Sequence, residues 1–141
     1  MTVRGNAASA DRINMAIFEF KPEDWLRFIE LKPFAIGWKD LGLDDDDQMA
    51  LQILIMLNPR AHPVVAGTGG LRKLRFAPPR WKSGKRGAAR VGYVYLQEYG
   101  VVLLVVAYAK NEKDDLTPSE KKAIRTLIGR IEDEFASGVT R

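Results

Sequence analysis

The chain has 141 residues, a formal net charge of +4, 46% hydrophobic residues and 28% charged residues. These values are typical of one globular domain and argue against a multidomain machine, a collagen-like protein and wholesale disorder. The absence of cysteine and the single histidine, His62, exclude disulfide scaffolds, thiolate metal sites and most histidine-based chemistry. No apolar run approaches the roughly 20 residues of a membrane span, and the N-terminus lacks the pattern of a signal peptide. We therefore expect a cytoplasmic protein with no membrane association, no metal and no cofactor.

The first elements of the fold are predicted after a polar N-terminal segment. Residues 1–25 are interpreted as a partly mobile extension and residues 26–137 as the single folded domain. Residues 16–20 and 27–31 both alternate apolar with polar side chains as short strands do, and either of the two could open the sheet. Lys32 and Pro33 begin a short amphipathic helix that ends near Gly42, because proline suits the first helical turn.

Four consecutive aspartates, residues 44–47, precede an apolar run over residues 48–57. Carboxylates at a helix N-terminus accept free N–H groups and complement the helix dipole, so a helix is predicted, ended by Asn58 and Pro59. Consecutive side chains at a helix start point in different directions, which argues against a metal site made by these acids.

Three strands are predicted between residues 71 and 108. The first follows a glycine-rich turn at residues 67–70 and places Lys73 and Arg75 on one face, with Leu74 and Phe76 on the other. A basic loop at residues 80–87 leads to a second strand at residues 90–96, and a turn near residues 98–100 leads to a third at residues 101–108. The third is apolar on both faces, which is typical of a middle strand covered on both sides.

Thr117, Pro118 and Glu120 combine an N-cap, a proline at the first helical position and the glutamate of a capping box. A helix is therefore predicted to follow and to end at Gly138. Together these elements predict one α+β domain, with N-terminal helices packed on a small, mainly antiparallel sheet and a C-terminal helix.

Asp and Glu are absent between Asp47 and Glu98, and this segment holds nine cations. We expect these cations to form one concave, positively charged surface. Their mutual repulsion costs stability unless a polyanion or an acidic partner offsets it. Nucleic acid is the favoured partner, with an acidic protein partner and a merely solvated face as the alternatives. The nine cations are Arg60, Arg72, Lys73, Arg75, Arg80, Lys82, Lys85, Arg86 and Arg90.

Three motifs of the chain occur together and in the order known from one protein family. They are GTGGLRKLRF at residues 67–76, GKRG at residues 84–87 followed by Arg90 in the next strand, and YAKNEKDDLTP at residues 108–118. Over roughly residues 27–134 the chain resembles the HigB-like branch of the RelE/ParE toxin superfamily, which implies a RelE-like fold.

The resemblance implies the toxin of a type II toxin–antitoxin pair, a ribosome-dependent mRNA endoribonuclease that enters the ribosomal A site and inhibits translation. It also implies a cognate antitoxin with a helix-turn-helix DNA-binding domain, through which alone operator DNA is bound. Two alternatives stay open, a non-catalytic gyrase inhibitor in the manner of ParE and a nucleic-acid-binding module without cleavage activity.

Cleavage of RNA by its own 2′-OH needs proton transfer and charge stabilisation at the phosphorane. Lys73, flanked in sequence by Arg72 and Arg75, is the candidate for proton transfer, because crowding by like charges favours a neutral amine. Arg75 and Arg90 are assigned to transition-state charge, since a guanidinium holds a phosphate in a bidentate fork and stays charged. RNA contacts are assigned to Arg72, Trp81, Lys82, Lys85, Arg86, Lys110, Asn111 and Lys113.

Several aromatic residues and His62 have a plainer interpretation. Trp81 is either a base-stacking surface or a lid over the sheet, and His62 is expected at the surface of a loop. Packing in the core or on the sheet is the expected role of Tyr93, Tyr95 and Tyr108. Classical RelE toxins carry an arginine near position 111 and a tyrosine near position 117, whereas this chain has neither. The resemblance then implies that the chemistry is redistributed among other residues, or that catalysis is slower or differently targeted.

Overall fold

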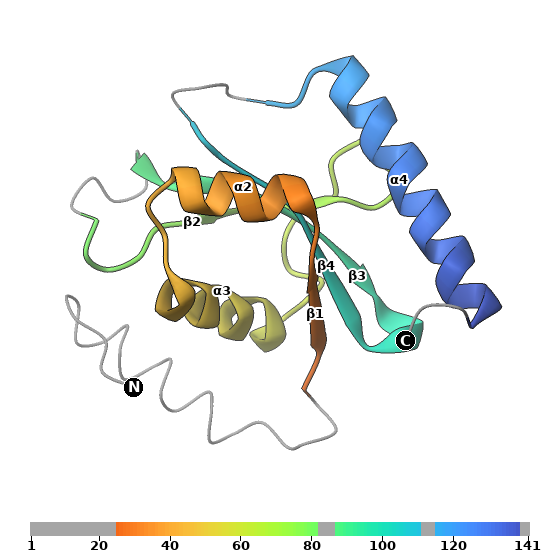
Figure 1. Cartoon of the computed structure of the whole chain (residues 1–141), viewed down its shortest axis with the longest axis horizontal. Helices are drawn as coiled ribbons and strands as arrows, with labels where there is room; N and C mark the ends of the chain where they lie inside the picture. Colours follow the sequence, from red (N-terminus) through yellow and green to blue (C-terminus); the bar gives the residue numbers. More distant parts are fainter. Residues whose placement is uncertain (1–24, 82–86, 111–114, 139–141) are drawn as a thin grey trace.

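The computed structural model of the chain describes residues 25–81, 87–110 and 115–138 (Figure 1). Four strands form one mixed sheet in the order β1-β4-β3-β2. Three helices and a short 3-10 helix complete the described part of the chain. This architecture confirms the predicted α+β class with N-terminal helices, a mainly antiparallel sheet and a C-terminal helix. The elements are β1 (Arg27–Glu30), α2 (Lys32–Asp40), α3 (Asp45–Leu57), β2 (Arg72–Phe76), β3 (Ala89–Leu96), η3 (Gln97–Tyr99), β4 (Val101–Ala109) and α4 (Pro118–Ser137).

The strand β4 lies in the middle of the sheet, as predicted. It pairs antiparallel with β3 on one side and parallel with β1 on the other, and every residue except Val106 and Ala109 is buried. The three strands β2, β3 and β4 form the predicted antiparallel series. The strand predicted at residues 16–20 lies outside the described residues, so β1 is the first strand that the structure describes.

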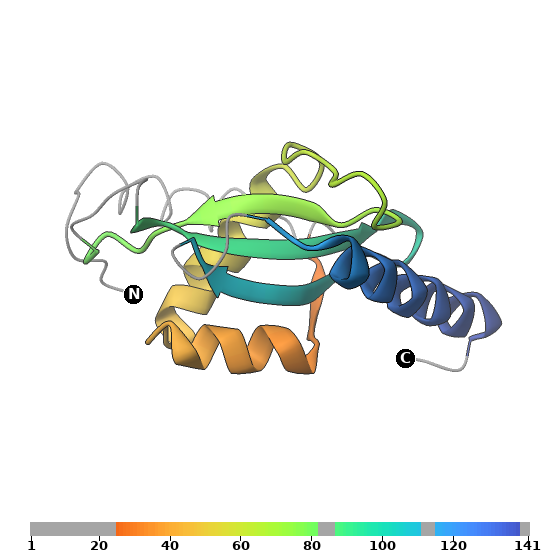
Figure 2. The same cartoon turned by 90° about the horizontal axis from the view of Figure 1, so that it is seen from above.

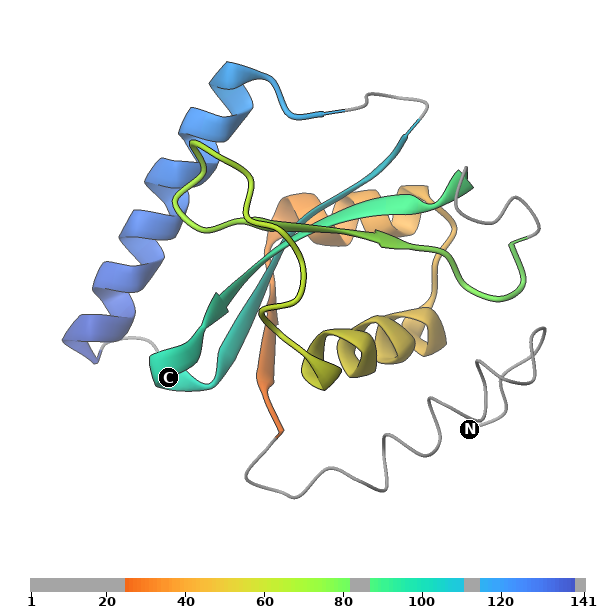
Figure 3. The same cartoon turned by 180° about the vertical axis from the view of Figure 1, so that it is seen from behind.

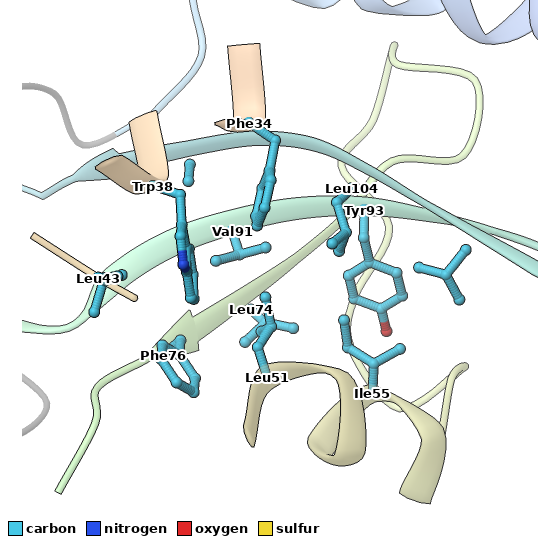
Figure 4. Packing of buried hydrophobic residues seen from close by; sticks show 12 residues of the cluster. Phe34, Trp38, Leu43, Leu51, Ile55, Leu74, Phe76, Val91, Tyr93 and Leu104 are labelled. Carbon is cyan, nitrogen blue, oxygen red and sulfur yellow. The ribbon is translucent and has the colours of Figure 1, made fainter. Parts of the chain in front are cut away.

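One core layer lies between the sheet and the helices α2 and α3, which lie on the same side of it (Figures 2 and 4). Phe34 and Trp38 of α2 stack with their ring centroids 5.2 Å apart, and Trp38 also contacts Phe76 of β2. Leu51 and Ile55 of α3 fill the rest of this layer and are fully buried. Burying such side chains stabilises the fold by about 1.5–3 kcal/mol each.

Gly37 allows α2 to lie directly against β4. A Cβ atom at this position would sit 1.9 Å from the carbonyl oxygen of Ala107 and 2.9 Å from its carbonyl carbon, closer than Cβ atoms of real proteins come to non-bonded atoms. The glycine therefore sets how closely the helix approaches the strand.

The other face of the sheet is covered in part by α4 (Figure 1). Ile128 and Phe135 are the buried residues of this helix, and they pack in a layer with Leu103 of β4. The helix begins with the predicted capping box, in which the Glu120 N–H donates to Thr117 Oγ1 and the Thr117 N–H donates to Glu120 Oε1. The helix ends at Ser137, and Gly138 follows as its C-cap in the left-handed conformation, as predicted.

The acidic start of α3 is also confirmed. Asp47 N–H donates to Asp44 Oδ1 and Asp44 N–H donates to Asp47 Oδ2, both at 2.9 Å, which is a reciprocal capping box. These two carboxylates are therefore engaged by the backbone of their own helix.

Among residues 25–81, 87–110 and 115–138, the helices lack the length and apolar character that crossing a membrane requires.

Candidate nucleic-acid interface

The two faces of β2 differ in chemistry, as the alternation of its residues predicts. Leu74 and Phe76 are buried in the core layer under α2 and α3. Lys73 and Arg75 point to the opposite face, where the Lys73 side chain is 30% exposed and Arg75 is exposed. β2 therefore presents two cations on the sheet face turned away from α2 and α3.

The strand register adds Arg90 to this face. Arg75 of β2 is directly opposite Arg90 of β3, and Arg90 is in turn directly opposite Tyr108 of β4. Opposed residues of neighbouring strands project from the same face of a sheet. The structure thus brings together the three predicted catalytic residues, Lys73, Arg75 and Arg90, and places a tyrosine beside them.

Arg90 differs from Lys73 and Arg75 because it is buried, with 3% of its surface exposed. Its Nη1 donates to the carbonyl oxygen of Ala88 at 2.9 Å. Within residues 25–81, 87–110 and 115–138, no Asp or Glu forms an ion pair with this guanidinium. Arg90 therefore supplies positive charge to the face from below the surface, where the effective dielectric constant is lower than in water.

Tyr108 is the residue of this face that sequence reasoning missed. It packs in the core layer next to α4, as predicted for a tyrosine on a strand, and it is also the cross-strand neighbour of Arg90. Burial raises the pKa of its phenol, as does the negative charge of Asp115, while Arg90 acts in the opposite direction. Only the register joins Tyr108 to the site, and the sequence does not reveal the register.

The lysine of the site has a carboxylate as its charged neighbour. Asp115 Oδ1 lies 3.8 Å from Lys73 Nζ, and Asp115 Oδ2 lies 4.0 Å from Nζ of Lys121 in the first turns of α4. The premise that Arg72 crowds Lys73 is wrong, because adjacent residues of a strand point to opposite faces, whereas Arg75 lies on the same face as Lys73.

Arg72 is engaged in holding the connection between α3 and β2. Its Nη1 donates to the carbonyl oxygens of Arg60 at 2.9 Å and His62 at 2.7 Å. Tyr93 Oη donates to the Pro59 carbonyl oxygen at 2.7 Å, and the Tyr93 ring meets the His62 ring edge-on. His62 is thus partly buried against the sheet, where burial and then the charge of Arg72 lower the pKa of its imidazole.

Two further cations of the acid-free segment have partners elsewhere. Arg80 forms an ion pair with Asp47 at the start of α3 and donates to the Gly42 carbonyl oxygen at 3.1 Å, and Arg60 donates to Gln97. The prediction of one continuous cationic surface is therefore wrong for Arg60, Arg72 and Arg80, while Lys82, Lys85 and Arg86 lie outside the described residues. Lys73, Arg75 and Arg90 form a smaller group on one sheet face.

Two hollows among the described residues lie away from these three cations. A groove of about 230 Å³ lies between β4 and α4 and is lined mainly by apolar side chains, among them Val106 and Leu127. A second hollow of about 590 Å³ lies between the turn after β3 and the last turns of α4. Neither is lined by Lys73, Arg75 or Arg90.

The remaining predicted RNA contacts are placed as follows. Trp81 is partly buried and packs against the core layer under α2 and α3, as the lid interpretation predicts. Lys110 is exposed directly after β4. The other assigned residues lie outside the described part of the chain, namely Lys82, Lys85, Arg86, Asn111 and Lys113.

No known protein-family model matches the chain. The interpretation of the site therefore depends on its geometry and on the motifs of the sequence.

Proposed function

We propose that this protein is a ribosome-dependent mRNA endoribonuclease, the toxin of a type II toxin–antitoxin pair. The observation that carries the proposal is the group of Lys73, Arg75 and Arg90 on one sheet face, next to Tyr108. Like charges placed directly opposite each other destabilise a sheet, and a buried cation costs free energy unless an anion neutralises it. A bound RNA phosphate supplies that anion.

Each cation has a role that follows from its exposure. Arg75 is exposed and has the planar fork that holds two oxygens of a phosphate. Arg90 is buried, and its charge stabilises the developing phosphorane through a medium of low dielectric constant.

Proton donation is assigned to Lys73 and hydrogen bonding to Tyr108, while solvent water takes the proton of the attacking 2′-OH. The ammonium group of a lysine can donate a proton to the departing 5′ oxygen, and Asp115 is the carboxylate beside Lys73 in the free protein. Burial raises the pKa of the Tyr108 phenol, and its hydroxyl can donate a hydrogen bond to the reacting phosphate.

The partner in this proposal is a cognate antitoxin with a helix-turn-helix domain. The motifs at residues 67–76, 84–87 and 108–118 support this partner by resemblance. Its simplest test is co-expression with the product of the adjacent open reading frame, which should relieve growth arrest.

The experiment that tests the activity is primer extension on a message after brief induction of the protein. We expect new 5′ ends within the translated region and none when the start codon of that message is removed. Inhibited DNA supercoiling without new mRNA ends would instead support a gyrase inhibitor. Salt-dependent RNA binding without cleavage products would support a plain binding module.

A further inference from the structure

Asp115, Lys73 and Lys121 form a charged cluster that the three assigned catalytic residues do not explain. The two lysines come from distant parts of the sequence, one from β2 and one from α4. Each faces a different oxygen of the same carboxylate, at 3.8 and 4.0 Å. Two ammonium groups thus converge on one anion at the border of the proposed RNA-cleaving face.

The ion pairs of this cluster are loose. Their distances exceed the roughly 2.7–2.9 Å of a tight charge-assisted hydrogen bond. The Asp115 side chain is 56% exposed, and exposed ion pairs contribute about 0–1 kcal/mol to stability. The two lysines therefore hold the carboxylate weakly, and a competing anion can take its place between them.

The surroundings also favour an anion at this place. Arg75 is two residues from Lys73 on the same strand face, a separation of roughly 6.6 Å along the strand. The α4 residue Arg125, one helical turn after Lys121, lies against Gly69 at the entry to β2, where the connection from α3 approaches α4 (Figure 3). Cations from two elements thus continue the charged face of β2 toward α4.

We propose that Lys73 and Lys121 form a phosphate-binding subsite for the RNA backbone, which Asp115 occupies in the free protein and leaves when the RNA binds. The proposal rests on the proposed function and extends it by a second phosphate position and a residue, Lys121, that the motifs do not include. A phosphodiester carries two charge-bearing oxygens on one atom, as a carboxylate does, so it can take the place of Asp115 between the two lysines.

The proposed subsite predicts opposite changes in RNA affinity for substitution of Lys121 and for substitution of Asp115. Lys121→Gln removes a phosphate contact and should weaken binding of an uncleavable 2′-O-methyl RNA several-fold. It should also lower the slope of log K against log salt concentration by about 0.7. Asp115→Asn removes the competing anion and should tighten binding several-fold. Lys122→Gln, the adjacent exposed lysine, and Asp133→Asn, at the far end of α4, are the matched controls.

A purely structural role of Asp115 predicts a different result for these variants. If Asp115 only ties α4 to β2, Asp115→Asn and Lys121→Gln should weaken RNA binding and lower the unfolding midpoint in the same direction. Equal RNA affinities for Lys121→Gln and Lys122→Gln would also overturn the subsite.

A second measurement separates the subsite from the proposed nuclease activity. The Leu116 N–H donates to Asp115 Oδ1 at 2.7 Å, so its amide resonance reports where the carboxylate is. Titration with inorganic phosphate at constant ionic strength should shift this resonance in the parent and leave it unmoved in Lys121→Gln. An unmoved resonance in the parent would overturn the subsite. A shift in a protein that cleaves no mRNA would support the subsite and contradict the nuclease.

Discussion

Arg75 and Arg90 lie directly opposite each other on the antiparallel strands β2 and β3, with their side chains on the same face of the sheet. Two like charges in this relation destabilise a sheet by a few tenths to about 1 kcal/mol. Arg90 is also buried, which adds the cost of removing a cation from water. A protein keeps such an arrangement when its function needs the charge, as stability and activity often compete at a site.

The first prediction is that Arg75→Gln separates activity from stability. The substitution removes the exposed member of the pair, so mRNA cleavage should fall by about 10²–10³-fold, the usual effect of losing one charge-stabilising donor. The free energy of unfolding should stay unchanged or rise by up to about 1 kcal/mol, because the repulsion is relieved. Primer extension and urea denaturation measure the two effects.

Arg130→Gln, on the exposed side of α4, is the control for the loss of one positive charge. It should leave both cleavage and stability within experimental error of the parent. If Arg75→Gln cleaved mRNA as well as Arg130→Gln, the assignment of Arg75 to the scissile phosphate would be wrong.

The second prediction concerns the contact between α2 and β4. Gly37→Ala introduces a Cβ that meets the Ala107 carbonyl oxygen at 1.9 Å, so the helix must move away from the strand. Phe34 and Trp38 would then lose packing, and we expect a loss of about 3 kcal/mol or more, in the range of severe core disruption. Urea denaturation followed by tryptophan fluorescence measures it.

Gly129→Ala is the matched substitution in α4, where nothing lies within 4 Å of the added Cβ. There the better helix propensity of alanine should raise the free energy of unfolding by about 0.5–1 kcal/mol. Equal effects at both positions would mean that α2 does not depend on the close approach at Gly37.

The local elements could be predicted because their signals are local. The Asp44 and Thr117 caps, the proline after Lys32 and the alternation around Lys73 each act within a few residues, and all four are confirmed. The identity of the middle strand followed from composition alone, since a strand covered on both sides is apolar throughout.

The partners of the charged residues could not be predicted, because they depend on contacts between distant segments. The partner of Arg80 is 33 residues away in α3, and Lys121 meets the site only because α4 returns to the sheet. The strand register, which joins Arg90 to Arg75 and Tyr108, is likewise a long-range property. The acid-free segment therefore predicts a larger cationic site than the described residues form.

The third prediction is that Asp47 contributes to stability in a pH-dependent way. Its partial burial acts to raise the pKa of its carboxyl, but the hydrogen bonds from Arg80 and from the Asp44 N–H outweigh burial and hold the pKa below its usual value. Asp47→Ala should cost about 1–3 kcal/mol at pH 7, through the lost cap and ion pair. Urea denaturation of both proteins at a series of pH values measures the difference.

The sign of this dependence follows from the lowered pKa. The contribution of Asp47 is fully present above the unfolded value of about 3.9 and is lost as the pH falls through the folded value. The parent and Asp47→Ala should therefore converge in strongly acidic solution. Asp46→Ala, at an exposed neighbouring position, should cost only about 0.3–1 kcal/mol from the helix dipole, and an equal cost would remove the special role of Asp47.

The fourth prediction concerns His62, whose imidazole packs edge-on against Tyr93 with Arg72 nearby. Because it is the only histidine in the sequence, its ring proton resonances are assigned at once in a proton NMR titration. Burial and the charge of Arg72 lower its pKa, so the midpoint should lie below 6.5 in the folded protein and return to about 6.5 in concentrated urea.

A lowered histidine pKa makes the folded protein bind fewer protons than the unfolded chain. Stability should therefore be fully present above about pH 6.5 and decline as the pH falls through the folded value of His62. His62→Gln should remove this decline and leave the acid loss from Asp47, which occurs at lower pH, in place. If the midpoint of His62 were instead above 6.5, the connection from α3 to β2 would not be packed against Tyr93 as the structure places it.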